Sequence, residues 1–135
     1  MKIMALDLGD AWVGTALTDP LRFFAKPYKT VTAHDLEAFL EETLHKEKIS
    51  TIIVGYPKTM QGRESEQTRL VVNTKEKLEK IFPQVTWVLW DERLSSKQAR
   101  NLKNPKNKTE KLEQHSIAAA IILETYLVFA NQAIC

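Results

Sequence analysis

The stretch Lys2–Gly14, KIMALDLGDAWVG, decides how this chain folds, because it joins an apolar strand, a carboxylate and a tight turn. Apolar residues surround Asp7 on both sides, which is the pattern of a strand buried on both faces of a sheet. Gly9 allows a sharp turn into a second strand over Trp12–Thr18. Asp7 therefore stands at the carboxyl end of the first strand, the edge where open α/β sheets hold ligands. The alternative is an aspartate that only caps the turn.

The length and composition of the chain favour one domain over residues 1–135. Its 135 residues can bury a sizeable core but are too few for two lobes. The longest apolar run, Ile117–Leu123, is too short to span a membrane, and the amino terminus does not resemble a secretion signal. Cys135 is the single cysteine, which excludes an intramolecular disulfide and a cysteine metal cluster. We therefore expect a cytoplasmic protein with no membrane segment.

The periodicity of apolar residues predicts the remaining elements. Three further strands are expected, over Leu21–Val31, Ser50–Gly55 and Val85–Trp90. Four helices are expected: one from a Thr32 N-cap to about Lys48, one stopped by Pro83, one over Ser95–Leu102 and one over Glu110–Asn131. This order predicts an α/β fold, with a mixed five-stranded sheet flanked by helices in a single domain.

A second carboxylate follows the last predicted strand, where Trp90 is succeeded by Asp91, Glu92 and Arg93. Magnesium prefers hard oxygen ligands and is usually held by one or two carboxylates plus substrate phosphates. If the first and fifth strands bring Asp7 and Glu92 together, this pair can bind a metal and orient water for attack on a phosphodiester. The alternative for Glu92 and Arg93 is a surface ion pair.

Five motifs, taken in order, resemble the YqgF family over nearly the whole chain. They are Ala5–Gly9 with Val13–Gly14, Thr18–Asp19, Ile53–Pro57 with Met60 and Gly62, Asp91–Ser95, and Ser116–Glu124. Members of this family are described as Holliday-junction-resolvase-like proteins or pre-16S rRNA nucleases, and they share the RNase H-like fold with RuvC resolvases. The resemblance implies an RNase H-like, metal-dependent nuclease.

The resemblance also implies the roles of individual residues. Asp7 and Glu92 match the first two active-site acids of the family, with magnesium or manganese as the metal. The third acid of the family is replaced here by His115. A histidine can ligate a metal or protonate a leaving group, and the alternative is a structural histidine at a helix start. Trp12 can stack on an unpaired base, or it can simply pack beside the turn.

A basic segment precedes the last helix. Between Lys97 and Lys111 six positive residues stand against one acid, Glu110, which gives a local charge of 6 − 1 = +5. The six are Lys97, Arg100, Lys103, Lys106, Lys108 and Lys111. Together with Arg93 this segment is a candidate binding surface for a phosphate backbone, and the alternative is a solvated loop.

Three functional hypotheses follow. The first is an endonuclease acting on structured RNA, with maturation of the 5′ end of pre-16S rRNA as its function and resolution of branched DNA as the alternative. The second is a nucleic-acid-binding protein that has lost turnover, because His115 and the first loop depart from the family pattern. The third is an actin-like ATPase or sugar kinase, suggested by Asp7-Leu8-Gly9 followed by Gly14-Thr15. The length argues against the third, and a monomer and a homodimer are both compatible with the sequence.

Overall fold

A computed structural model describes residues 1–9, 11–56, 66–91 and 108–134, and all structural statements concern these residues. Their elements, in order, are β1 (Lys2–Leu8), β2 (Trp12–Thr18), β3 (Ala25–Thr32), α1 (Leu36–Lys46), β4 (Ile49–Tyr56), α2 (Glu66–Ile81), β5 (Thr86–Asp91) and α4 (Lys108–Ile134). The predicted α/β fold with five strands is confirmed. The predicted helix over Ser95–Leu102 lies outside the described residues.

The five strands form one mixed sheet in the order β3-β2-β1-β4-β5. β2 is antiparallel to both β1 and β3, whereas β4 is parallel to both β1 and β5. In this register Leu6 lies beside Val54, and Val54 lies beside Leu89. The carboxyl ends of β1, β4 and β5 therefore meet at one edge of the sheet.

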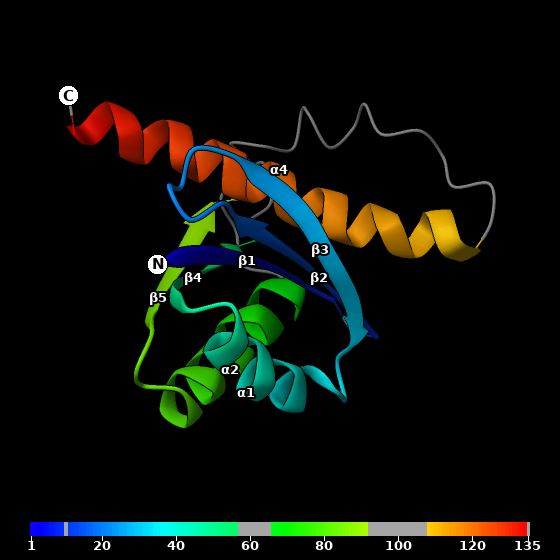
Figure 1. Ribbon diagram of the computed structural model, residues 1–135. Coiled ribbons are helices and arrows are strands. Elements are labelled where there is room, and N and C mark those ends of the chain that lie inside the picture. The colour runs from blue at the N-terminus through cyan, green and yellow to red at the C-terminus, as the bar shows by residue number, and fades with distance from the viewer. Residues whose placement is uncertain (10, 57–65, 92–107, 135) are drawn as a thin grey trace.

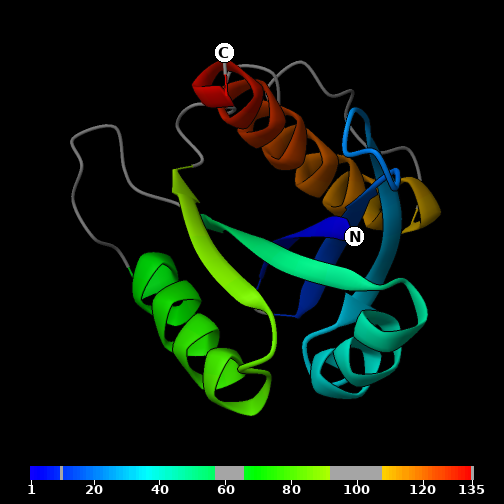
Figure 2. The same ribbon diagram turned by 60° about the vertical axis from the view of Figure 1, so that its left-hand side comes forward.

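Helices cover both faces of this sheet, with α1 and α2 on one face and α4 on the other (Figures 1 and 2). Side chains alternate along β1, as they must in a strand. Met4 and Leu6 belong to the core under α1 and α2, whereas Ile3 and Ala5 belong to the core under α4. The prediction that β1 is buried on both faces is confirmed.

Two predicted boundaries are wrong for local reasons. The carboxylate of Asp19 accepts backbone N–H bonds from Leu21 and Phe23, so a loop precedes β3 and pairing starts at Ala25 rather than Leu21. Thr32 ends β3 instead of capping a helix, and its hydroxyl oxygen accepts the N–H of Asp35 at 3.1 Å. Asp35 is the N-cap residue of α1, without a side-chain capping bond.

The last helix, α4, is the longest element, with 27 residues. It runs along β1, β2 and β3, and its buried residues Ala119, Ala120, Leu123 and Leu127 line the sheet. The prediction that the apolar run of this helix packs against the sheet is confirmed. Across the described residues, none of the helices combines the length and the apolar content that a membrane span needs.

Candidate active site

Asp7 lies near the carboxyl end of β1, on the face that α4 covers. Ile3 and Ala5 point into the core under α4, so the alternation of the strand places Asp7 on the same face. Asp7 is half-buried, and it pairs directly with Gly14 of β2 across the antiparallel ladder. A carboxylate at this position is shielded from bulk water and still reachable from the edge of the sheet.

Gly14 is the point where α4 comes closest to the sheet. A Cβ atom on Gly14 would collide with the backbone carbonyl of His115 and would come within 2.8 Å of the backbone nitrogen of Ser116. Only a glycine leaves room for the helix backbone here. The fold therefore sets the backbone of half-buried His115 directly over the residue that pairs with Asp7.

The turn between β1 and β2 fixes the end of the strand that carries Asp7. The N–H of Gly9 donates to the carbonyl of Trp12 at 3.1 Å, and a Cβ atom on Gly9 would lie 2.8 Å from that oxygen. On the side of α2, the amide Nε2 of Gln67 donates to the carbonyl of Leu8 at 2.9 Å. The predicted sharp turn at Gly9 is confirmed, and these bonds hold both strand ends in place.

Trp12 starts β2 two positions before Gly14, so strand alternation places it on the α4 face as well. It is half-buried. The fold thus gathers the positions of Asp7, Trp12 and His115 on one face and at one end of the sheet. These are the three predicted site residues whose side chains lie in the described part of the chain.

The side chains of the other predicted site residues lie outside the described part of the chain, although Asp91, which precedes Glu92, is described. Asp91 is the last residue of β5 and lies in register with Tyr56 of β4, at the edge where β1 also ends. Outside the described residues lie Glu92, Arg93, Lys97, Arg100, Lys103 and Lys106. Lys108 is the first residue of α4. The predicted roles of these residues stay predictions.

The metal-binding potential of the site follows from its donors. Within the part of the chain that the structure describes, no three His, Cys, Asp or Glu side chains group closely enough to hold a metal ion. Asp7 supplies one carboxylate of the kind that magnesium prefers, and His115 supplies an imidazole, a ligand that suits borderline transition metals better than magnesium. These donors fit a divalent metal if one more carboxylate joins them.

Sequence reasoning did not predict the structural roles of two residues of this site. Gly14 allows the close approach of α4, and Gln67 ties α2 to the end of β1. The small residues on both sides of the contact, Gly14 and Ala16 on β2 and Ala118–Ala120 on α4, are the pattern that could have indicated a helix packed close to a strand. No local pattern marks Gln67.

The sheet order and the placement of α4 define an RNase H-like fold of the type found in RuvC resolvases. T. thermophilus RuvC in complex with Holliday junction substrate matches with a TM-score of 0.60 and 13% identity, over 96% of each chain. The T. thermophilus RuvC structure alone matches with a TM-score of 0.57 and 11% identity, over 96% of this chain and 97% of that one. Since the identity is low, these matches establish the fold, and they confirm the predicted class.

The sequence comparison gives the family. A family model described as "RuvX: Holliday junction resolvase" matches residues 1–128. A relative from Rubrobacter xylanophilus, named "Putative pre-16S rRNA nuclease", is 34% identical over 133 residues, or 98% of this chain and 96% of the relative. A relative of the same name from Phocaeicola vulgatus is 35% identical over 131 residues, or 93% and 94% of the two chains. The chain belongs to the RuvX family, also called YqgF, and this membership places it among the nucleases, hydrolases that act on nucleic acid.

Proposed function

We propose that this protein is a metal-dependent endonuclease that cleaves phosphodiester bonds in structured RNA, and that it processes the 5′ end of pre-16S rRNA. The observation that carries the proposal is the contact of α4 with Gly14, which brings the backbone of His115 over the residue that pairs with Asp7. Open α/β sheets hold their ligands at the edge where Asp7 lies. The names of the relatives in Rubrobacter xylanophilus and Phocaeicola vulgatus support pre-16S rRNA as the substrate.

In this proposal Asp7 and Glu92 hold a divalent metal through their carboxylates, and His115 completes the site. When bound, the metal supplies a water activated for attack and neutralises charge on the scissile phosphate. His115 acts either as a third ligand, through a neutral ring nitrogen, or as the acid that gives a proton to the leaving oxygen. Half-burial limits the access of bulk water to both Asp7 and His115.

The basic segment between β5 and α4 is proposed to bind the phosphate backbone. Its residues Lys97, Arg100, Lys103, Lys106 and Lys108, with Arg93, come in the sequence between Glu92 and His115, so both ends of the segment adjoin proposed site residues. Trp12 is proposed to stack on an unpaired base near Asp7. Affinity for nucleic acid should then fall steeply as salt concentration rises.

The test of this function is direct. Purified protein is incubated with a pre-16S rRNA 5′ fragment and with a four-way DNA junction, each with magnesium and with manganese. The Asp7→Asn protein, purified in parallel, controls for contaminating nucleases. We expect metal-dependent cleavage of the RNA by the wild type alone. Tight binding of RNA without cleavage under any metal would instead support the nucleic-acid-binding hypothesis.

Junction resolution is the second candidate function, because the matching family model is described as a Holliday junction resolvase. The same experiment separates the two, since a resolvase cuts the four-way junction symmetrically and leaves linear pre-16S RNA intact. Preferential cleavage of the junction would replace pre-16S rRNA as the proposed substrate.

The role of His115 is tested by His115→Asp, which restores a third carboxylate. If His115 is a ligand, the wild type should prefer manganese, and the variant should gain activity with magnesium. If His115 is the acid, the variant should lose activity with both metals. A variant with unchanged rate and metal preference would show that His115 is structural.

A further inference from the structure

The loop between β2 and β3 is held in one conformation by Asp19. The carboxylate of Asp19 accepts backbone N–H bonds from Leu21 at 3.2 Å, Phe23 at 2.9 Å and Phe24 at 2.7 Å. The backbone of Asp19 closes the same loop, since its N–H donates to the carbonyl of Phe24 and its carbonyl accepts the N–H of Arg22. The bond from Phe24 is the main reason that the pKa of Asp19 lies below its usual value.

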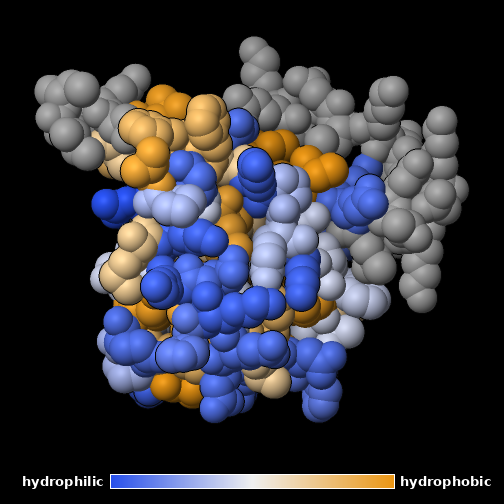
Figure 3. Space-filling view, in the orientation of Figure 1, coloured by the Kyte–Doolittle hydropathy of each residue, from blue (hydrophilic) through white to orange (hydrophobic). Residues whose placement is uncertain are grey.

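This fixed loop presents apolar side chains to water. Leu21, Phe23 and Phe24 are 73%, 62% and 69% exposed, and on the neighbouring helix α4 Val128 is 58% exposed. We call these four residues the loop–helix patch. Figure 3 shows apolar side chains gathered at the upper left, over the C-terminal part of α4 and the adjoining loop. Exposed apolar patches of this kind mark binding surfaces in soluble proteins.

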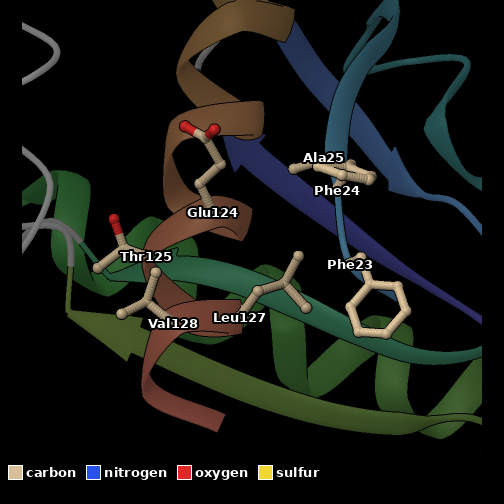
Figure 4. Close-up of a pocket in the computed structure, with 7 residues that line it drawn as sticks. All are labelled: Phe23, Phe24, Ala25, Glu124, Thr125, Leu127 and Val128. Atoms are coloured by element: carbon tan, nitrogen blue, oxygen red, sulfur yellow. The ribbon is translucent and has the colours of Figure 1, made fainter. Parts of the chain in front are cut away.

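A groove of about 340 Å³ runs through the loop–helix patch. Phe23 and Phe24 form one wall, and Leu127 and Val128 of α4 form the other (Figure 4). Glu124 also lines it and is the only charged residue between Ser116 and Ala130. Aromatic side chains with few charges are the composition of an interface core.

The side chains of the groove are complementary to those of the loop. The loop offers an apolar residue, a cation and two further apolar residues, in the order Leu21-Arg22-Phe23-Phe24. The groove offers apolar walls and one carboxylate. A two-fold contact between identical chains requires a surface that is complementary to itself. The loop supplies apolar side chains and the cation of Arg22, and the groove supplies apolar walls and the carboxylate of Glu124.

We propose that the loop–helix patch is a homodimer interface, in which the loop of one copy packs into the α4 groove of the other and Arg22 of each copy faces Glu124 of the other. The Asp19 bonds fix the loop before association, which reduces the conformational entropy lost on binding. This inference does not depend on the proposed nuclease function.

Sedimentation analysis of the full chain tests the interface. We expect a reversible dimer, and we expect the double variant Phe23→Ser/Phe24→Ser to raise its dissociation constant about thirty-fold or more, the scale of buried aromatic anchors. Ile81→Ser is the matched control, because it removes an apolar side chain that is 43% exposed on α2, on the opposite face of the sheet. It should leave the dissociation constant unchanged. A wild type that stays monomeric up to about 0.5 mM would overturn the proposal and leave the groove to a partner of different sequence.

A charge exchange tests the pairing of Arg22 with Glu124. Arg22→Glu and Glu124→Arg each place like charges across the proposed interface, so each should weaken self-association about tenfold. An equal mixture of the two variants should form a heterodimer, because both contacts are then attractive. Circular dichroism checks that both variants are folded. If both fold and the mixture associates no better than either alone, the proposed pairing is wrong.

Discussion

The two faces of the sheet are built from different residues, although the same strands contribute to both. Under α1 and α2 the core consists of large side chains, among them Met4, Leu40, Ile52, Leu78 and Trp87. Under α4 alanines stand among the larger side chains of the core, namely Ala5, Ala16, Ala119 and Ala120, with Gly14 at the closest point. Large side chains keep a helix at a distance from a sheet, whereas alanine and glycine let its backbone approach.

The two faces therefore have different roles: one contributes most to stability, and the other positions the residues of the candidate site. The core under α1 and α2 contains more buried apolar side chains than the core under α4, and burial of such side chains is the main source of stabilisation. The core under α4 has fewer buried residues, and four of them are alanines, but the close approach at Gly14 fixes the backbone of His115 relative to the strand that carries Asp7. We therefore expect substitutions on the first face to change mainly the free energy of unfolding, and those on the second to change mainly activity.

The largest expected effect comes from Asp7→Asn on the α4 face. The amide cannot supply the negative charge that the proposed metal site needs, so cleavage should fall on the order of 10³-fold or more. The free energy of unfolding, measured with urea, should stay the same or rise slightly, because a charge that repels Glu92 in the proposed site is removed. Cleavage at the wild-type rate would remove the nuclease assignment from this site.

The next effect comes from Leu40→Ala on the α1/α2 face. Leu40 is fully buried, and truncating such a side chain lowers the free energy of unfolding by about 2–5 kcal/mol. The cleavage rate per folded molecule should stay close to that of the wild type, measured at a temperature where both proteins are folded. A large loss of cleavage in the folded variant would contradict the expectation that the α1/α2 face affects stability and not activity.

A smaller change in stability, but a specific one, is expected for Gly14→Ala. The added methyl meets the helix backbone rather than a flexible side chain, so α4 must shift, at a cost of about 1–3 kcal/mol. His115 moves with α4, so cleavage should fall even where the variant is fully folded. Val13→Ile is the matched control, since it adds one methylene at the neighbouring position, which faces α1 and α2. Equal activity losses in the two variants would contradict a special role of the α4 contact.

The smallest expected effect concerns Asp19, at the loop beside the end of α4. Its pKa is lowered in the folded protein, chiefly by the N–H of Phe24, so its carboxylate stabilises the fold at pH values above the usual pKa of 3.8. This contribution is lost as the pH falls below 3.8 and through the lower pKa of the folded state. On acidification, the free energy of unfolding should therefore fall less for Asp19→Asn than for the wild type. Urea titration at several pH values measures this difference. Identical pH profiles for the variant and the wild type would show that the loop bonds contribute nothing.

The sequence predicted what depends on local patterns. The apolar run around Asp7 predicted a buried strand, and Gly9 predicted the turn after it. The predicted start of β3 was wrong because the carboxylate of Asp19 accepts backbone N–H bonds from Phe23 and Phe24. The sequence of these residues is compatible with both a strand and a loop. The packing of His115 over Gly14 could not be predicted from periodicity, since the two residues lie far apart in the sequence and meet only when α4 docks. Glu92 was indicated by its place after a strand and the basic residues by their local charge, and the resemblance to the YqgF family gave Glu92 the role of an active-site acid. These roles stay predictions.

The docking of α4 on Gly14 also means that the fold is completed late in synthesis, because α4 follows all five strands in the chain. A ribosome makes β1 to β5 well before the residues of α4 emerge, and domains fold as their segments become available. Until then the nascent sheet has no helix over Ala5 and Ile53, and His115 is absent from the position beside Asp7. Because the proposed site needs Asp7 of β1 and His115 of α4, it forms only after α4 has emerged and docked on the sheet.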